Sequence, residues 1–202
     1  SLSEAVINVD GVFHVAALYK FWTDHETDIY QVNVGGTETL LQAARGAGVP
    51  KFVFTSSVGT LKSQGWGVPI DEESVATPAD LPDDYHRSKL LSEQAALAAN
   101  SGDMEVVAVN PTTPIGEHDV KPTPTGRIVL EFLRHRFPGY LNGEINFIDV
   151  RDAARRFRRP ARGRPGVGPA RPHRRLHDGD RVDPVRLGGG NVPAQGHGRR
   201  RG

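Results

Sequence analysis

The stretch that decides the fold is Lys51-Phe52-Val53-Phe54-Thr55-Ser56-Ser57, a run of apolar residues that ends in two serines. A continuous apolar run of this length is too short for a surface helix and is typical of a strand buried in a parallel sheet. Residues 11–16 and 105–109 have the same character, and residues 28–47 and 85–100 carry apolar side chains at helical spacing. This alternation predicts an α/β fold with a parallel sheet covered by helices.

The helix predicted over residues 28–47 is interrupted by Gly35-Gly36. Each glycine inside a helix costs about 1 kcal/mol relative to alanine, so a pair needs a structural reason. One interpretation is the close approach of a ligand or another backbone, and the other is a kink or packing contact without a ligand. Residues 58–84, rich in Gly, Pro, Asp and Ser, predict a long loop between a strand and a helix, and such loops are often functional.

Composition places the chain among globular proteins that fold without disulfides. The 202 residues include 37% hydrophobic residues and no cysteine, which excludes disulfide bonds, thiolate zinc sites and cysteine nucleophiles. No apolar run approaches the roughly 18–20 residues that span a bilayer, and the first residues lack the pattern of a signal peptide. We therefore expect neither membrane insertion nor secretion, and the cytoplasm as the location.

The net charge of +1 conceals two parts of opposite charge. Residues 1–154 contain 11 Lys and Arg against 21 Asp and Glu, whereas residues 155–202 contain 14 against 3. The second part is rich in Gly and Pro and has too few large apolar side chains to offset the conformational entropy lost on ordering. The sequence predicts one domain over 1–154 and a disordered, basic C-terminal tail over 155–202.

Two interpretations of this tail stay open. A shifted reading frame in GC-rich DNA would produce the abrupt change into Arg, Gly, Pro and Ala. A true basic extension would attract phosphate backbones by counterion release. Because Phe157 is the only aromatic residue in the tail, base stacking is not indicated, and we do not expect nucleic acid among the partners.

Three side chains carry the chemistry. Tyr85 and Lys89 are four residues apart at the start of a predicted helix, which places both on one helical face. An ammonium near a phenol favours the phenolate and would lower the tyrosine pKa from its usual value near 10. Ser57, at the end of a strand, could hold a substrate oxygen against that phenol. The trio predicts proton exchange with an alcohol or a carbonyl group.

On these residues the sequence resembles the extended short-chain dehydrogenases/reductases, the NAD-dependent epimerase/dehydratase family. The resemblance covers about residues 1–154 and is most like the dihydroflavonol-reductase branch, while Lys121–Arg127 is similar to the bacterial hopanoid-associated sugar epimerases. The segments that carry it are Val12–Ala17, Asn33–Thr37, Phe52–Ser57, Tyr85–Lys89, Asn110–Gly116 and Phe147–Val150.

The resemblance implies a role for each member of the trio. Tyr85 would be the general acid/base, Lys89 would lower its pKa and hold the nicotinamide ribose, and Ser57 would orient the substrate oxygen. We choose Ser57 over Ser56 because the family's serine is the last of its run. NAD or NADP would exchange hydride with a secondary carbinol carbon. Besides Tyr85 and Lys89, the cofactor would lie along Ala16, Ala17, Pro111 and Thr112.

The activity that the resemblance implies is that of a NAD(P)-dependent epimerase or oxidoreductase acting on a secondary alcohol or ketone, such as a nucleotide sugar or a hopanoid-linked sugar. A dihydroflavonol-4-reductase-like ketone reductase is the alternative among enzymes. The alternative of another class is an inactive relic or interaction module with a basic, nucleic-acid-binding tail. The expected partners are a small-molecule substrate and a second copy of the chain in a homodimer, without a metal.

The sequence departs from the family at the dinucleotide fingerprint, because no Gly-x-x-Gly-x-x-Gly turn follows a predicted strand. The comparable cluster at Gly163, Gly166 and Gly168 lies among Arg and Pro. In the family three strands and two helices precede the position of Ser1. The resemblance therefore implies an incomplete doubly wound parallel sheet of the Rossmann type, with residues 11–16 at an unpaired apolar edge. We therefore expect a fragment that binds dinucleotide poorly.

Isolated polar and aromatic residues receive simpler interpretations. His14 lies in a predicted strand, and we expect a packed, hydrogen-bonded core residue rather than a metal ligand. Asp83 and Asp84 precede a predicted helix, where capping charge explains them. Tyr19 and Trp22 either line the substrate pocket or cover the sheet.

Overall fold

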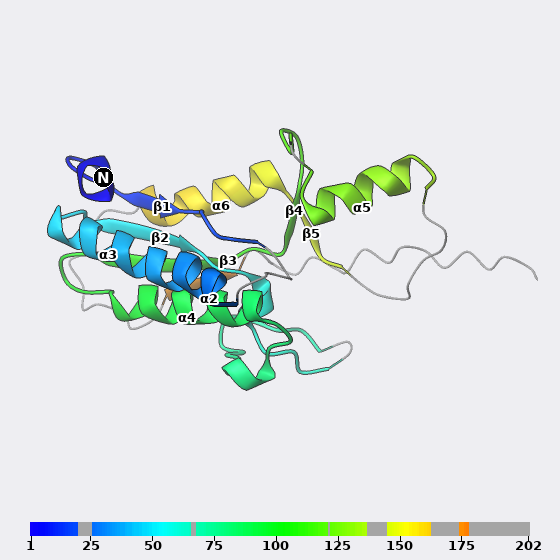
Figure 1. Ribbon diagram of the computed structural model, residues 1–202, viewed down its shortest axis with the longest axis horizontal. Coiled ribbons are helices and arrows are strands. Elements are labelled where there is room, and N and C mark those ends of the chain that lie inside the picture. The colour runs from blue at the N-terminus through cyan, green and yellow to red at the C-terminus, as the bar shows by residue number, and fades with distance from the viewer. Residues whose placement is uncertain (20–25, 66–67, 121, 137–144, 163–173, 178–202) are drawn as a thin grey trace, which may run out of the picture.

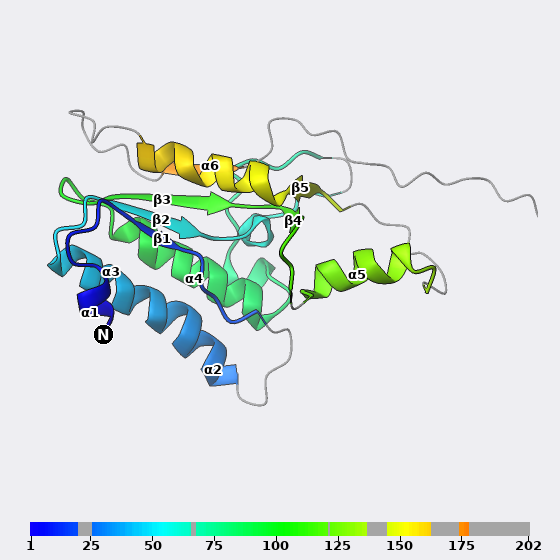
Figure 2. The ribbon, with the colours of Figure 1, turned by 90° about the horizontal axis from the view of Figure 1, so that it is seen from above.

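A parallel sheet with helices on both faces forms the body of the molecule (Figures 1 and 2). The strand order β1-β2-β3-β6 follows the order along the chain, and each neighbouring pair is parallel. The predicted α/β fold with a parallel sheet is therefore confirmed. The strands of this sheet are β1 (Val12–His14), β2 (Lys51–Thr55), β3 (Glu105–Asn110) and β6 (Arg174–His177). The computed structural model describes residues 1–19, 26–65, 68–120, 122–136, 145–162 and 174–177.

One face of the sheet packs against α3 (Gly36–Gly46) and α4 (Asp84–Ala98), as Figure 2 shows. Alternate residues of a strand point to opposite faces, so Phe52 and Phe54 of β2 enter this layer together. Both phenylalanines are at most 1% exposed. The short helix α1 (Leu2–Ala5) precedes β1 and packs beside α3. The buried members of this core are Val6, Leu41, Ala44, Val49, Phe52, Phe54, Ala96, Leu97, Met104, Val106 and Ala108.

The helix predicted over 28–47 is observed as α2 (Glu26–Tyr30), a π-helical turn η1 (Gln31–Gly35) and α3. The wider turn shifts the helical register, and Val32, which we expected on the buried face, is 52% exposed. Gly35 and Gly36 have ordinary helical φ angles of −61° and −63°, and nothing lies within 4 Å of a Cβ built on either. The interruption is therefore the π-helical turn, and the structure shows no close approach at the two glycines.

Helix α4 begins one residue before the predicted start, and the Asp83 carboxylate caps it by accepting the His86 N–H at 2.9 Å. The predicted capping role of Asp83 is thus confirmed. Of the apolar residues predicted to be buried in this helix, Leu90 and Leu97 are buried, whereas Leu91 and Ala95 are only half-buried. The face toward the end of β2 also buries polar residues. The preceding loop contains the short 3₁₀ helices η2 (Val58–Thr60) and η3 (Pro78–Asp80). The buried polar residues of α4 are Ser88, Lys89, Ser92 and Glu93.

The opposite face of the sheet is covered by α6 (Val150–Arg162), which Figure 2 shows on the far side from α3 and α4. Phe157 packs on a cluster formed by Val53, Val107 and Val109. We predicted disorder from residue 155 onward, and this is wrong for the end of α6 and for β6, because an apolar anchor and a sheet edge support them. The rest of that tail, including the glycines at 163–168, lies outside the described residues.

A second, two-stranded parallel sheet joins β4 (Thr113–Ile115) to β5 (Phe147–Asp149) where the first sheet ends. Helix α5 (Pro124–Leu133) extends away from it, capped by the Thr123 hydroxyl, which accepts the Gly126 N–H at 3.1 Å. No residue of α5 is buried. Apolar side chains of this helix therefore face outward among the described residues.

Strand β1 forms one edge of the sheet. In the described part of the chain it pairs only with β2. Phe13 is 45% exposed and Val15, just beyond the strand, is 63% exposed. The predicted unpaired apolar edge is therefore confirmed for these residues.

None of the helices within the described segments is both long and apolar enough to cross a bilayer.

Candidate active site

The predicted site residues gather at the carboxyl ends of the first three strands, where parallel α/β sheets bind their ligands. Ala16 and Ala17 follow β1 and are exposed. Ser57 comes two residues after β2 and is half-buried. Pro111 and Thr112 follow β3 directly and are half-buried. Tyr85 and Lys89 come from the first two turns of α4.

Tyr85 lies in an aromatic cluster at the start of α4. Its ring meets Tyr19 edge-on at 4.8 Å between centroids and His86 at 5.3 Å. Burial, with further contributions from Tyr19 and Asp83, raises the pKa of Tyr85 to about 12. We expected Lys89 to lower this pKa, and that expectation is wrong for this structure. The phenol is therefore protonated at neutral pH.

Lys89 explains the difference, because its ammonium is directed to the strand end. The Nζ atom donates to the carbonyl oxygen of Thr55, the last residue of β2, and lies 4.5 Å from the centre of the Phe54 ring. The side chain is 2% exposed, and burial lowers the pKa of Lys89 to about 8, against an opposing effect of Glu93. The lysine thus ties α4 to the end of β2.

Ser57 has an extended backbone, with φ −156° and ψ 147°, and caps η2. Its Oγ accepts the Gly59 N–H at 3.1 Å, so the hydroxyl proton is available for a substrate oxygen. Gly59 has no room for a side chain, because a Cβ there would collide with the ring of His86. That ring is oriented by Asp83, whose Oδ1 lies 2.8 Å from His86 Nδ1. The serine turn and the start of α4 are therefore in direct contact.

A buried polar cluster, which the sequence did not predict, lies beneath this turn. Glu93 is fully buried and its Oε2 accepts hydrogen bonds from Ser56, Thr60 and Asn110. The signal that could have revealed it is the spacing, since Glu93 is one helical turn beyond Lys89 on the same face. Its role could not be read from the sequence, because its partners come from other elements.

Asn33 is a second residue whose role the sequence did not show. It belongs to the π-helical turn and is 3% exposed. Its Oδ1 accepts the Leu18 N–H at 2.7 Å, and its Nδ2 donates to the Leu18 carbonyl at 3.2 Å and to Ser88 Oγ at 2.9 Å. The side chain therefore holds the segment after β1, which contains Ala16 and Ala17, against α4.

The structure shows the surroundings of His14, predicted to be a packed core residue, and of Tyr19, predicted to line the pocket or cover the sheet. His14 is buried, and its Nε2 lies 2.9 Å from Thr37 Oγ1. The prediction of a hydrogen-bonded core histidine is confirmed. Tyr19 contacts the ring of Tyr85 and so belongs to the site's surroundings. Trp22 lies outside the described residues.

The polar groups at this edge fit the nicotinamide ribose end of a dinucleotide. Lys89 supplies a buried ammonium there, and two buried oxygens, Thr55 Oγ1 and Asn110 Oδ1, have no hydrogen-bond partner in the structure. The pyrophosphate end has no counterpart, because the sequence contains no Gly-x-x-Gly-x-x-Gly turn. Across the described segments, His, Asp and Glu side chains form no cluster of three that could hold a metal ion.

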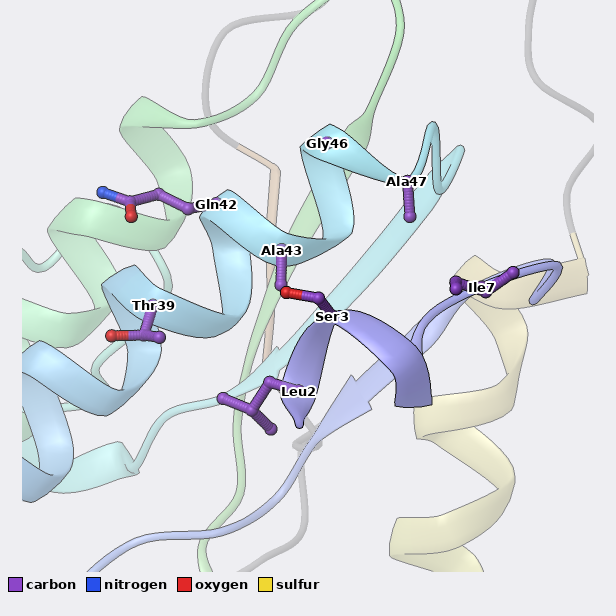
Figure 3. A pocket seen from close by; sticks show the side chains of 8 residues that line it. All are labelled: Leu2, Ser3, Ile7, Thr39, Gln42, Ala43, Gly46 and Ala47. Carbon is purple, nitrogen blue, oxygen red and sulfur yellow. The ribbon is translucent and has the colours of Figure 1, made fainter.

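Away from these side chains, the described residues line two further cavities. One, of about 440 Å³, lies between β4 and α5 and includes Ile115, Val129 and Val150 in its lining. The other, of about 550 Å³, lies between the N-terminal segment and α3 (Figure 3). Because α1 precedes β1, this second cavity is at the opposite end of the strands from the site. It is lined by Leu2, Ser3, Ile7, Thr39, Gln42, Ala43, Gly46 and Ala47.

Curated proteins are similar in sequence to this chain over about three quarters of its length. A putative dihydroflavonol 4-reductase of Synechocystis is 43% identical over 153 residues, which are 76% of this chain and 45% of that protein. Sterol demethylase protein B of Methylococcus capsulatus is 32% identical over 75% of this chain and 46% of that protein. The chain thus spans about half the length of the curated relatives it matches.

A solved structure has the same architecture. That of MoeE5, in complex with UDP-glucuronic acid and NAD, aligns with a TM-score of 0.71 and 26% identity, over 88% of this chain and 59% of that one. The resemblance to the extended short-chain dehydrogenases/reductases is confirmed. Residues 1–134 match one family in particular. Because this match covers more than half of the sequence, the chain belongs to the 3-beta hydroxysteroid dehydrogenase/isomerase family.

Proposed function

We propose that this chain carries the proton-transfer part of a NAD(P)-dependent oxidoreductase site that acts on a secondary alcohol or the corresponding ketone. The observation that supports this most is the attachment of the Ser57 turn to the helix that presents Tyr85 and Lys89. Lys89 bonds the end of β2, and His86, next to Tyr85, packs on Gly59. A hydroxyl, a phenol and an ammonium therefore share one edge of the sheet.

The chain's own residues act on the substrate oxygen. A nicotinamide dinucleotide, when bound, supplies or accepts the hydride. The Ser57 hydroxyl donates a hydrogen bond to the substrate oxygen, since its Oγ already accepts the Gly59 N–H. The Tyr85 phenol, protonated at neutral pH, gives its proton to that oxygen in ketone reduction and is left as a phenolate. In alcohol oxidation the reverse step starts from that phenolate, which accepts the hydroxyl proton. Lys89 would hold the nicotinamide ribose of that dinucleotide.

The names of the relatives favour ketone reduction over the other candidate. The relative with 43% identity is a putative dihydroflavonol 4-reductase, and one of 32% identity is a 3 beta-hydroxysteroid dehydrogenase/isomerase. The second candidate is epimerisation of a nucleotide sugar, which the likeness to MoeE5 in complex with UDP-glucuronic acid and NAD supports. A ketone takes part in both reactions, as the substrate of a reductase and as a transient intermediate of an epimerase, so the same trio would serve either.

The decisive experiment is Tyr85→Phe in the full chain. Turnover is measured through reduced nicotinamide, with flavanone ketones, hydroxysteroids and UDP-sugars as substrates at equal cofactor concentration. Removing the phenolic hydroxyl is expected to lower turnover about 10²–10⁴-fold, as for loss of a general acid. Tyr30→Phe is the matched control, because the Tyr30 hydroxyl bonds Asp84 at the start of the same helix and touches no proposed substrate atom. Equal turnover in the two variants would contradict the proposal.

A further inference from the structure

Glu93 is a buried acid that the proposed chemistry does not use. It lies on α4 with 0% of its surface exposed. Its Oε2 receives the Ser56 hydroxyl, the Thr60 hydroxyl at 2.9 Å and the Asn110 amide at 2.9 Å. A carboxylate is costly to bury unless such donors satisfy it, and bonds to a charged acceptor are the stronger ones. Three donors on one oxygen therefore make this carboxylate the centre of the cluster.

The donors come from two strand ends that flank the candidate site. Ser56 and Thr60 belong to the segment after β2, and Asn110 is the last residue of β3. Both Thr60 and Asn110 also reach the carbonyl oxygen of Ser57: the Thr60 hydroxyl lies 2.8 Å from it, and the Asn110 amide donates to it at 3.2 Å. The Thr60 hydroxyl has one proton, so it donates either to Glu93 or to the Ser57 carbonyl. The Asn110 amide has two N–H groups and can bond both, so it links Glu93 to the Ser57 peptide.

The charge of Glu93 is also linked to the site. Lys89 precedes it by one helical turn, and the carboxylate favours the charged form of that ammonium. Lys89 in turn bonds Thr55, which adjoins Ser56. The same short segment of chain is therefore tied to α4 at two consecutive turns, once by a cation and once by an anion.

We propose that Glu93 is a positioning residue, whose carboxylate fixes the Ser57 turn to α4 through Ser56, Thr60 and Asn110. The catalytic meaning of this clamp rests on the proposed function, because only there does the separation between the Ser57 hydroxyl and the Tyr85 phenol matter. The clamp itself is independent of any substrate. Within the clamped turn, the Gly59 N–H donates to Ser57 Oγ at 3.1 Å, so exchange of this amide reports on the turn.

Hydrogen exchange of the Gly59 amide in the full chain tests the clamp. Glu93→Gln removes the charge at nearly constant shape, and we expect exchange over residues 57–60 to rise about tenfold or more while β3 stays protected. Leu97→Ala is the matched control, because Leu97 is a buried residue of the same helix in the apolar core. It is expected to raise exchange throughout the sheet. Unchanged exchange at 57–60 in Glu93→Gln, or a rise no different from that of Leu97→Ala, overturns the proposal.

A pair of substitutions at Thr60 keeps the test decisive if Glu93→Gln does not fold. Thr60→Val keeps the shape of the buried side chain but removes the hydroxyl between Ser57 and Glu93, and it is expected to raise exchange at Gly59. Thr60→Ser restores the hydroxyl and is expected to return exchange toward that of the unmodified chain. Equal exchange in the valine and serine variants overturns the proposal.

Steady-state kinetics separate positioning from general damage. Glu93→Gln is expected to lower kcat about 10–100-fold with KM little changed, because a displaced serine affects the reacting geometry more than substrate binding. A fall in kcat no larger than that of Leu97→Ala argues against positioning. If the unmodified chain turns over none of the substrates, the proposed function fails, and hydrogen exchange alone decides the clamp.

Discussion

The surroundings of His14, a buried residue of β1, determine its protonation state. The Thr37 hydroxyl donates to the Asn33 carbonyl at 2.6 Å, so its oxygen is left to accept from His14 Nε2. The neutral ring packs edge-on to Phe52 and tilted against Phe54. Burial, together with the nearby charge of Lys89, lowers the pKa of His14 to about 4. Folding therefore favours the neutral form of this ring.

This pKa predicts how stability depends on acidity. Above pH 6.5 both the folded and the unfolded ring are neutral, and the full stability is present. As pH falls from 6.5 toward 4, the unfolded chain binds a proton that the folded chain does not, so about 3 kcal/mol is lost. Asp80 and Asp149, whose pKa values are lowered, contribute only below this window. Urea unfolding at pH 7 and pH 4.5 is expected to show this loss, and His14→Gln is expected to remove it.

An equal loss in His14→Gln would contradict this assignment. The substitution keeps a donor for Thr37 but cannot titrate, so only the pH-dependent part should disappear. The variant is expected to be less stable than the unmodified chain at pH 7, because the aromatic contacts with Phe52 and Phe54 are lost.

At this scale the sequence predicts residues whose meaning lies in local spacing. Tyr85 and Lys89 are one turn apart on any helix, and Ser57 ends a recognisable strand. Glu93 and Asn33 could not be assigned, because their partners lie on elements distant in sequence. The direction of the Tyr85 pKa could not be predicted either, since it depends on burial and on where the Lys89 ammonium points.

Among the elements, α6 is where sequence and structure differ most. Composition alone favoured disorder after residue 154, because arginine dominates the segment. A single half-buried aromatic side chain, Phe157, nevertheless packs on the valines of β2 and β3 and gives the helix an apolar side. The arginines need no burial, since those at 151, 155 and 158 are exposed. Average composition therefore does not show that one apolar residue, Phe157, can anchor a helix on the sheet.

Phe157→Ala tests this account of α6. Loss of the half-buried ring is expected to lower the free energy of unfolding by about 1–3 kcal/mol, less than for a fully buried phenylalanine. Phe132→Ala is the matched control: Phe132 is 63% exposed on α5, and its loss is expected to change stability by about 0.5 kcal/mol at most. Thermal or urea unfolding measures both. Similar effects of the two substitutions would show that Phe157 does not anchor the helix.

The strands and the two long helices were predictable because their patterns are local. β2 and β3 match the predicted runs within one residue, and α4 begins one residue early. The π-helical turn was not predictable, since Gly35 and Gly36 fit several interpretations and only the packing of Asn33 selects among them. β6 was not predictable because its residues pair at a sheet edge without an apolar run of their own.

For the whole molecule, the missing glycine turn sets the expected cofactor affinity. The described residues supply groups for the nicotinamide ribose end, but the sequence offers no turn for the pyrophosphate. Isothermal titration of the full chain with NADH and NADPH is expected to give dissociation constants of about 1 mM or weaker. Micromolar binding by a monodisperse sample would show that other residues replace the turn.

The order of the main sheet also governs how the chain reaches its structure. Strands β1, β2, β3 and β6 lie in sequence order and all run parallel, so the described sheet contains no hairpin. Each pairing must close a loop of several tens of residues, and the chain entropy is lost before the strand hydrogen bonds stabilise the pair. Such topologies are therefore slow to fold. Helices can form within microseconds, whereas the strands have to wait for distant segments. During synthesis, β2 can pair with β1, which emerges first, but its other edge stays unpaired until the residues of β3 have left the ribosome. Chaperones have that interval in which to act.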